Sequence, residues 1–165
     1  DVGYGWLRAA PGIGMALTAL VFTRRPVTRH VGRVLLTVVA VFGAATIVLG
    51  STRNYALAFL ALVVLGGADM VSVFIRSTLV PLVTPDSKRG RVLAVENVFI
   101  GASNELGAFE SGVAAAALGT PATVIGGGVA TMVVVAVWSR LFPMLRGLDR
   151  FEDIDVPDDG DGVPV

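Results

Sequence analysis

Apolar runs long enough to cross a membrane recur along this chain and limit the folds open to it. Residues 34–52 and 121–139 contain no charged side chain and lack the polar face, with a period of 3.6 residues, of a helix in a soluble bundle. In lipid, only helices and closed barrels satisfy every backbone polar group. Runs of nineteen residues exceed strand length and match the roughly 20 residues of a membrane-spanning helix. We therefore predict an all-α integral membrane protein.

The composition excludes several classes of function. The chain has no cysteine and one histidine, so it offers no thiolate chemistry and no Cys or His cluster for a metal. No nucleophile–base pair appears. Gly126, Gly127 and Gly128 lack the Lys-Ser/Thr ending of a phosphate-binding loop, so we assign them to helix packing. We expect no enzyme, no metal, no cofactor and no nucleic-acid partner.

The apolar runs and breaks divide the chain into five expected crossings and a tail. The crossings form one transmembrane bundle over residues 1–150, whereas residues 151–165 alternate acidic residues with Gly and Pro and predict a disordered tail. Residue 1 is Asp, and no cleavage signal is present, so we expect a piece of a longer protein. The five crossings are predicted at residues 4–23, 34–52, 55–82, 91–118 and 121–141.

Basic residues set the expected orientation. Ten of the thirteen Lys and Arg lie in segments 24–33, 88–91 and 140–150, which five crossings place on one side. The opposite side has only Arg8 and Arg53. Because short cytoplasmic loops are rich in Lys and Arg, we expect the basic side and the acidic tail to be cytoplasmic.

Two ionisable residues interrupt the third apolar run. Asp69 and Arg76 are seven residues apart and so lie on nearly the same face of a helix. Charges within a membrane span are costly and mark functional positions or ion pairs. Both readings stay open: a charge relay or substrate contact facing a cavity, or a structural ion pair that helps helices to pack.

The fourth run has the most polar side chains. Glu105 lies near its centre, about 20 Å of helix beyond Arg91. It can carry a proton or contact substrate, or it can hydrogen-bond to a neighbouring helix. Small residues at 101, 108 and 112 are expected to permit close helix contact. The other candidates for substrate contact or coupling on this run are Asn97, Asn104 and Glu110.

Two motifs resemble the major facilitator superfamily. Residues 25–33 are similar to the cytoplasmic loop Gly-x-x-x-Asp-Arg-x-Gly-Arg-Arg of those transporters, with Gly32 and Arg33 matching and Arg29 in place of the Asp. Residues 75–86, 89–92 and 99–112 resemble the branch that contains the enterobactin exporter, whose members are often labelled transmembrane secretion effectors. The first of these segments reads Ile-Arg-Ser-Thr-Leu-Val-Pro-Leu-Val-Thr-Pro-Asp, and the last contains Gly-Ala-Ser-Asn-Glu-Leu-Gly.

This resemblance covers roughly residues 1–150 and implies that the five runs are helices eight to twelve of such a transporter, most of its C-terminal six-helix half. It implies proton-coupled export of a siderophore or drug-like molecule by alternating access, in the cell membrane, which in bacteria is the inner membrane. The implied partners are lipid, a small-molecule substrate and an N-terminal half. The alternative is a non-transporting membrane component or an assembly or secretion partner. The candidates for a cytoplasmic gating loop are Gly32, Arg33, Arg76, Arg89, Gly90 and Arg91, with Gly90 expected to supply a special backbone angle in a turn.

Overall fold

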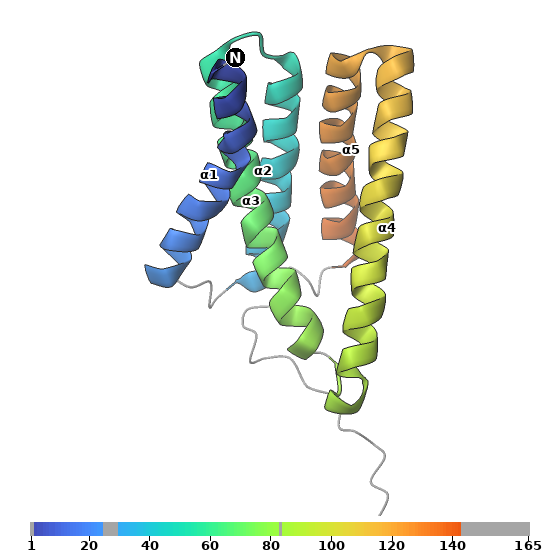
Figure 1. Cartoon of the computed structure of the whole chain (residues 1–165). Helices are drawn as coiled ribbons and strands as arrows, with labels where there is room; N and C mark the ends of the chain where they lie inside the picture. Colours follow the sequence, from blue (N-terminus) through green and yellow to red (C-terminus); the bar gives the residue numbers. More distant parts are fainter. Residues whose placement is uncertain (1, 25–29, 83, 143–165) are drawn as a thin grey trace, which may run out of the picture.

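The chain folds as five helices joined by short connections (Figure 1). The computed structural model describes residues 2–24, 30–82 and 84–142; in these residues it contains helices and no strand, as the sequence predicts. The expected acidic tail at 151–165 lies outside the described residues. The helices are α1 (Val2–Arg24), α2 (Val31–Ser51), α3 (Tyr55–Leu82), α4 (Asp86–Leu118) and α5 (Thr120–Leu141).

The start of α4 corrects the sequence-based expectation. We expected residues 87–91 to form a turn, but α4 begins at Asp86, and the Lys88 backbone N–H donates to the carbonyl oxygen of Pro85 over 3.0 Å. Pro85 directly precedes the helix, and the Asp86 carboxylate in the first turn is favourable there because it complements the helix dipole. Gly90 is therefore helical, and among the described glycines only Gly119 has a positive φ, of 84°. The prediction that Gly90 adopts a special backbone angle is wrong.

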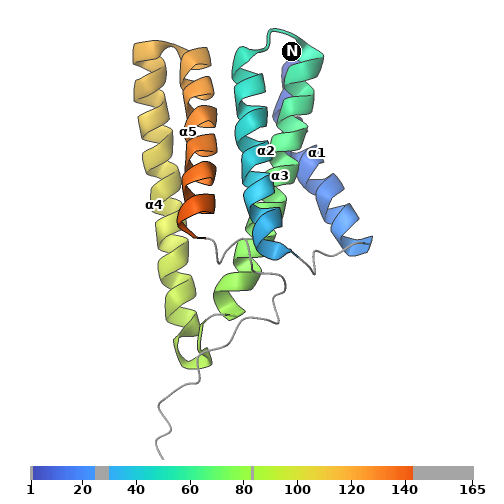
Figure 2. The same cartoon turned by 180° about the vertical axis from the view of Figure 1, so that it is seen from behind.

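The helices form two groups that meet through α2 and α5. α1 packs along α3, α2 contacts both α3 and α5, and α4 runs beside α5 with few contacts to α3. Figures 1 and 2, from opposite sides, both show α4 and α5 as one pair beside the group of α1, α2 and α3. No residue of α4 is buried. One broad side of α4 therefore faces away from the other described helices.

Glycines set the closest contacts between helices. A Cβ atom on Gly14 of α1 would overlap the carbonyl oxygen of Val63 on α3, and one on Gly66 of α3 would overlap that of Pro11 on α1. On the other side, a Cβ on Gly128 of α5 would lie 2.8 Å from the carbonyl oxygen of Gly43 on α2. Small residues allow helix backbones to approach this closely in membranes. The assignment of Gly128 to packing is confirmed.

A small apolar core joins α2 and α3. Val31 and Ile75 are fully buried, and Val71 is nearly so. Phe22 and Phe74 pack beside them with their rings edge to face and their centroids 5.4 Å apart. Outside this core, many large apolar side chains are exposed, including Phe99 and Phe109 of α4. Such extended apolar surface is typical of helices that meet lipid or other helices and not water.

Four helices, α1, α2, α3 and α5, are long and apolar enough to span a membrane. α4 does not meet the same criteria, since its glutamates lower its apolar character. α4 nevertheless runs over the same height of the molecule as its neighbours α3 and α5. In Figure 1, α3 ends at the foot of the molecule and α5 starts at its top, and α4 connects these two points. If α3 and α5 both span the membrane in the same direction, α4 has to cross back between them.

Cysteine labelling tests this path. The chain has no native cysteine, so Thr52→Cys, Ser87→Cys and Thr120→Cys can each be probed in intact cells with an impermeant thiol reagent. We expect positions 52 and 120 to label from outside and position 87 only after the cytoplasm is opened, because both α3 and α4 separate 87 from the other two. Labelling of 87 and 120 from the same side would contradict the five-crossing arrangement.

Candidate functional site

A row of polar side chains follows one face of α3. Asp69, Ser72 and Arg76 lie three and four residues apart, a spacing that places them on one helix face. Asp69 is half-buried and lines a cavity of about 200 Å³. The other walls of this cavity come from Val38, Val39 and Phe42 of α2, Ala68 and Ser72 of α3 and Thr131 of α5.

Arg76 lies between two further cavities. The first, of about 350 Å³, is formed with residues of α2 and α5 that include Gly32 and Trp138, and it shares Ser72 with the Asp69 cavity. The second, of about 310 Å³, lies between α3 and α4 and includes Ser77, Glu96 and Asn97. Because neighbouring cavities share residues of the row, the row Asp69–Ser72–Arg76 connects the space beside α2 and α5 with the space beside α4.

Asp69 and Arg76 do not form an ion pair with each other in the described structure. In the described part of the chain, the carboxylate of Asp69 and the guanidinium of Arg76 form no ion pair with each other; Arg76 instead donates from Nε to the carbonyl oxygen of Ser72 over 3.4 Å. Ser72 is one turn away on the same helix. The charges of Asp69 and Arg76 are therefore presented to the cavities and not neutralised by one another.

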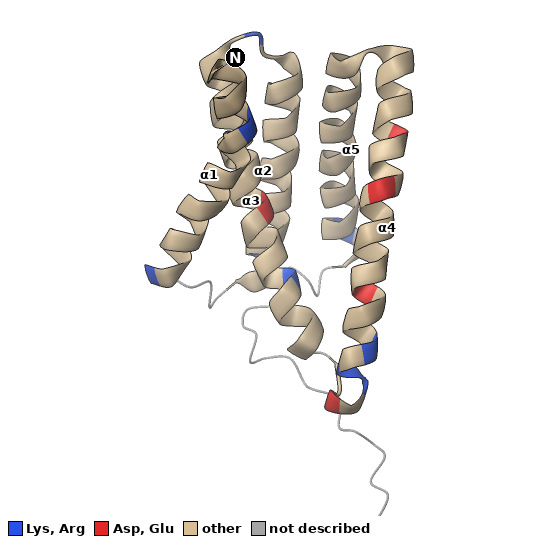
Figure 3. Ribbon diagram, viewed as in Figure 1, with Lys and Arg blue, Asp and Glu red and all other residues tan. Residues whose placement is uncertain are grey.

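The polar residues of α4 divide into two sets. Glu96 is half-buried, and it and Asn97 face Arg76 across the cavity between α3 and α4. Asn104, Glu105 and Glu110 are exposed. A Cβ placed on Gly101 or on Gly112 would meet no described atom within 4 Å, so the close contact expected there does not occur within these five helices. Figure 3 shows acidic residues spread along α4.

Asp69 and Glu105 nevertheless lie at similar depth. Asp69 is about 21 Å along α3 from Tyr55, and Glu105 is about 20 Å along α4 from its end at Leu118. Those two helix ends lie near the same level in Figure 1. Asp69 and Glu105 thus place two carboxylates at a similar depth near the middle of the helices. Asp69 lines a cavity, whereas Glu105 lies on open surface.

The corner between α3 and α4 holds Arg89. Its Nε donates to the carbonyl oxygen of Pro81 over 3.2 Å, and its Nη2 lies 2.6 Å from Oδ1 of Asp86. The Thr84 hydroxyl donates to the carbonyl oxygen of Val80 over 2.6 Å. Arg89 therefore fixes the end of α3 to the start of α4, whereas Gly90 and Arg91 are exposed within α4.

Removing this tie is expected to loosen the corner. Arg89→Gln loses the ion pair with Asp86, which is exposed and contributes little, and weakens the bond to the Pro81 carbonyl, worth about 1 kcal/mol. Amide exchange at Thr84 and Lys88 is expected to accelerate about fivefold. Arg91→Gln removes a similar charge without a contact to α3 and is the control. Equal exchange in both variants would show that Arg89 does not hold the corner.

The start of α2 separates the two residues that matched the loop motif. Gly32 is buried and lines the cavity that also contains Arg76 and Trp138. Arg33 is exposed and lines a different cavity, shared only with residues of α2 and α5. Arg25 and Arg29 lie outside the described residues. Within the described ranges, no group of three or more His, Cys, Asp or Glu could hold a metal ion.

The fold and these cavities define a class of protein. Four apolar helices of spanning length, exposed apolar side chains and charges facing cavities between helices characterise a multi-pass helical membrane protein. The sequence matches the family model of transmembrane secretion effectors over residues 1–155. The chain therefore belongs to this family, a branch of the major facilitator superfamily of transporters. Searches of curated proteins and of solved structures gave no match.

Sequence reasoning missed two residues of the cavities. Ser72 is a small polar residue in an apolar run and carries no signal beyond its place between Asp69 and Arg76. Glu96 was not among the candidate residues of the fourth run. Its signal was available, since Arg76 and Glu96 are each ten residues from Asp86, and residues equally far from the turn of a helical hairpin meet.

Proposed function

We propose that the chain forms helices eight to twelve, most of the C-terminal half, of a secondary active exporter that moves a small organic molecule outward by alternating access. Membership of the transmembrane secretion effector family supports a transporter. Its basic segments support a cytoplasmic C-terminus. Transporters of this superfamily bind substrate near the middle of the membrane between two halves.

The half-buried Asp69 beside a cavity carries the proposal. An ionisable residue within a membrane span costs about 2.5–3.5 kcal/mol on insertion scales unless it faces protein or water. Asp69 faces a cavity between α2, α3 and α5, at the depth where such transporters bind and couple. A carboxylate there can take up and release a proton as the cavity opens to one side and then to the other. We assign proton coupling to Asp69.

The exposed side of α4 supplies the substrate surface in this proposal. Glu105 lies at the same level as Asp69 and is exposed, as are Asn104 and Glu110, whereas Asn97 adds a polar side chain at the cavity between α3 and α4. In the complete transporter this side of α4 contacts substrate and the N-terminal half. Such an arrangement explains why α4 keeps three glutamates and buries no residue.

Arg76 and Glu96 serve as a cytoplasmic gate. Both lie about 32 Å from the outer ends of their helices and line one cavity between α3 and α4. Narrowing this cavity brings opposite charges together and closes the path, whereas widening it separates them and admits substrate. Arg89 holds the α3–α4 corner, so in this proposal the two helices open and close about that corner.

Transport by the polypeptide that the gene encodes tests this function. The protein is placed in inside-out vesicles, and uptake of a panel of small organic molecules, siderophores included, is measured with an imposed proton gradient. We expect saturable uptake of at least one compound that an uncoupler abolishes. A polypeptide consisting of these five helices alone and giving no flux would favour the alternative of a non-transporting membrane component.

A further inference from the structure

The cavity of about 350 Å³ that contains Arg76 and Trp138 lies where α2, α3 and α5 meet. Leu35 and Val39 of α2 and Val134 and Trp138 of α5 give it apolar walls. Ligand cavities have volumes of about 300–1,000 Å³ and are lined mostly by hydrophobic and aromatic side chains, with a few polar groups. This cavity therefore has the size and the lining of a site for a small molecule. We call it the Arg76–Trp138 cavity.

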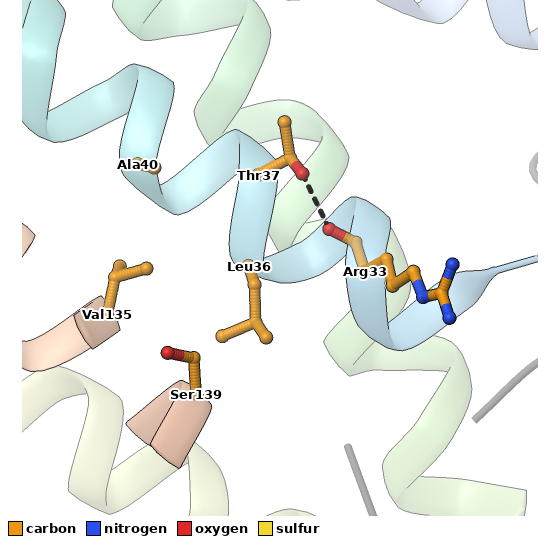
Figure 4. A pocket seen from close by; sticks show the side chains of 6 residues that line it. All are labelled: Arg33, Leu36, Thr37, Ala40, Val135 and Ser139. Atoms are coloured by element: carbon orange, nitrogen blue, oxygen red, sulfur yellow. Dashed lines mark hydrogen bonds between the residues drawn. The ribbon is translucent and has the colours of Figure 1, made fainter. Parts of the chain in front are cut away.

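The Arg76–Trp138 cavity holds a single charged side chain. Leu36 and Val135 line both this cavity and a neighbouring one of about 680 Å³, so they lie between the two. In Figure 4, which shows the neighbouring cavity, the Arg33 side chain extends away from Leu36 and Val135. Among the described residues that line the Arg76–Trp138 cavity, Arg76 is the only charged one and none is acidic.

Most of the hydrogen-bonding capacity of Arg76 is unused. Within residues 2–24, 30–82 and 84–142, its one hydrogen bond runs from Nε to the Ser72 carbonyl oxygen over 3.4 Å, and it forms no ion pair. The two Nη atoms carry four of the five N–H donors of a guanidinium. The Ser72 hydroxyl, which also belongs to this cavity, forms no hydrogen bond with the described chain. The α3 wall therefore offers a cation and a hydroxyl whose donors are available to a ligand.

The cavity lies at the basic end of the molecule. Gly32 in the first turn of α2 and Trp138 in the last turn of α5 both line it, and Figure 2 shows these two helix ends at the same level. Arg76 is exposed, so an anion can reach it. Charges attract more strongly beside apolar walls than in open water. The arrangement complements a molecule that joins a negative group to an apolar body.

We propose that the Arg76–Trp138 cavity binds a compact organic carboxylate, with the carboxylate at Arg76 and Ser72 and a ring-sized apolar body between Val39, Val134 and Trp138. A guanidinium binds a carboxylate through two parallel N–H···O bonds, and aromatic rings pack favourably on tryptophan. A volume near the lower limit for ligand sites favours a compact molecule over a phospholipid. The assignment does not depend on the transport proposal, because it requires only the packing of α2, α3 and α5.

The test uses 2-naphthoate, which joins a carboxylate to a rigid two-ring body. The full polypeptide encoded by the gene is purified in detergent, and binding is measured by isothermal titration calorimetry. 2-Naphthamide has the same body without the charge and is expected to bind about tenfold more weakly, because hydrogen bonds between charged groups are the stronger ones. Acetate, a carboxylate without the body, is expected to give no measurable binding at the same concentrations. Decanoate has the same carboxylate on a flexible chain and is expected to bind more weakly than 2-naphthoate, since ordering the chain costs entropy.

Three variants locate the site. Arg76→Gln is expected to lower the affinity for 2-naphthoate about tenfold, because the charged partner of the carboxylate is lost. Arg140→Gln is the matched control: it removes an exposed arginine from the last turn of α5 that does not line the cavity, and it is expected to keep the affinity within about twofold of the wild type. Val134→Phe fills the cavity from α5 and leaves Arg76 in place. It is expected to lower the affinity for 2-naphthoate, so the test does not depend on the stability of the Arg76 variant.

Glu96→Gln is expected to change the affinity in the opposite direction. Arg76 also lines the cavity between α3 and α4, where Glu96 is half-buried. The carboxylates of the ligand and of Glu96 therefore compete for one guanidinium. Removing the charge of Glu96 is expected to raise the affinity for 2-naphthoate about threefold, as an ion pair accessible to water predicts. A gain in affinity cannot result from a loss of folding.

Several results would overturn the proposal. Equal affinity for 2-naphthoate and 2-naphthamide, or equal losses in Arg76→Gln and Arg140→Gln, would show that Arg76 does not hold a carboxylate. Unchanged affinity in Val134→Phe would show that the ligand binds outside the cavity. Tighter binding of decanoate than of 2-naphthoate would assign the cavity to an acyl chain derived from lipid and not to a compact molecule.

Discussion

Replacing Gly14 with alanine is expected to separate α1 from α3 and to reduce the yield of folded protein severalfold. The added Cβ would overlap the carbonyl oxygen of Val63 and lie 2.9 Å from the backbone nitrogen of Gly67. These are backbone atoms, which cannot rotate away as a side chain can. Forcing extra atoms into a packed contact costs about 1–3 kcal/mol, and more where the neighbours cannot move. That is a large part of the stability of an ordinary protein.

Gly12→Ala is the matched control for this prediction. Gly12 is two residues earlier on α1, and a Cβ there would meet no described atom within 4 Å. Alanine favours helix over glycine by up to about 1 kcal/mol, so this variant is expected to be as stable as the parent or more stable. Yield and thermal midpoint of fluorescent fusions, measured by size-exclusion chromatography, give the comparison. If the two variants behaved alike, α1 would not pack on α3 through Gly14.

Most of the fold follows from hydropathy and helix-breaking residues, whereas the start of α4 does not. Pro85 and Gly119 mark helix boundaries as the sequence indicates, because Pro85 directly precedes α4 and Gly119 adopts a positive φ between α4 and α5. Lys88, Arg89 and Arg91 looked like a loop because a hydropathy pattern ends where charges begin. Hydropathy reports the solvent around a segment, not its backbone. A helix that leaves the lipid can continue unchanged into water, and α4 is helical from Asp86 to Leu118 across both its charged and its apolar part.

The packing of glycines was only partly predictable. Gly128 was assigned to packing and lies against the backbone of Gly43, whereas Gly126 and Gly127, which were assigned with it, face open space. The sequence contains the small residues but not the rotation of each helix about its axis. That rotation is fixed by contacts between helices that are far apart in sequence, such as Gly66 with Pro11. The same limit applies to Gly101 and Gly112, which were expected to be close contacts and are open.

The candidate site was predictable to the level of a helix face. The interval between Asp69 and Arg76 placed them together on α3, and both line cavities in the structure. The sequence could not indicate that the cavities come from α2 and α5 on one side and from α4 on the other, because that depends on the order of helices in space. The sequence also placed Glu105 near the centre of its run, a depth that Asp69 shares in the structure.

The largest functional effect is expected at Asp69. In the polypeptide that the gene encodes, Asp69→Asn keeps the size of the side chain and its capacity for hydrogen bonds but cannot release a proton. If Asp69 couples transport to protons, the variant should lose gradient-driven efflux to the level of protein-free vesicles. It should still exchange labelled for unlabelled substrate across the membrane, since exchange needs binding and alternating access but no net proton movement. Its exchange rate should also be independent of pH.

Glu105→Gln is the matched comparison, since it removes one carboxylate at the same depth but from the exposed side of α4. If Glu105 contacts substrate, this variant should bind substrate more weakly, remain driven by the proton gradient and keep its pH dependence. The two variants together separate coupling from binding. Asp69→Asn is expected to lose proton coupling and keep exchange, whereas Glu105→Gln is expected to keep coupling and bind substrate more weakly. Normal gradient-driven efflux in Asp69→Asn, with uncoupled exchange in Glu105→Gln, would move the coupling carboxylate from the α2–α3–α5 cavity to α4. Loss of exchange as well as efflux in Asp69→Asn would instead mean that Asp69 holds the substrate or the helices, and its assignment as the proton carrier would be wrong.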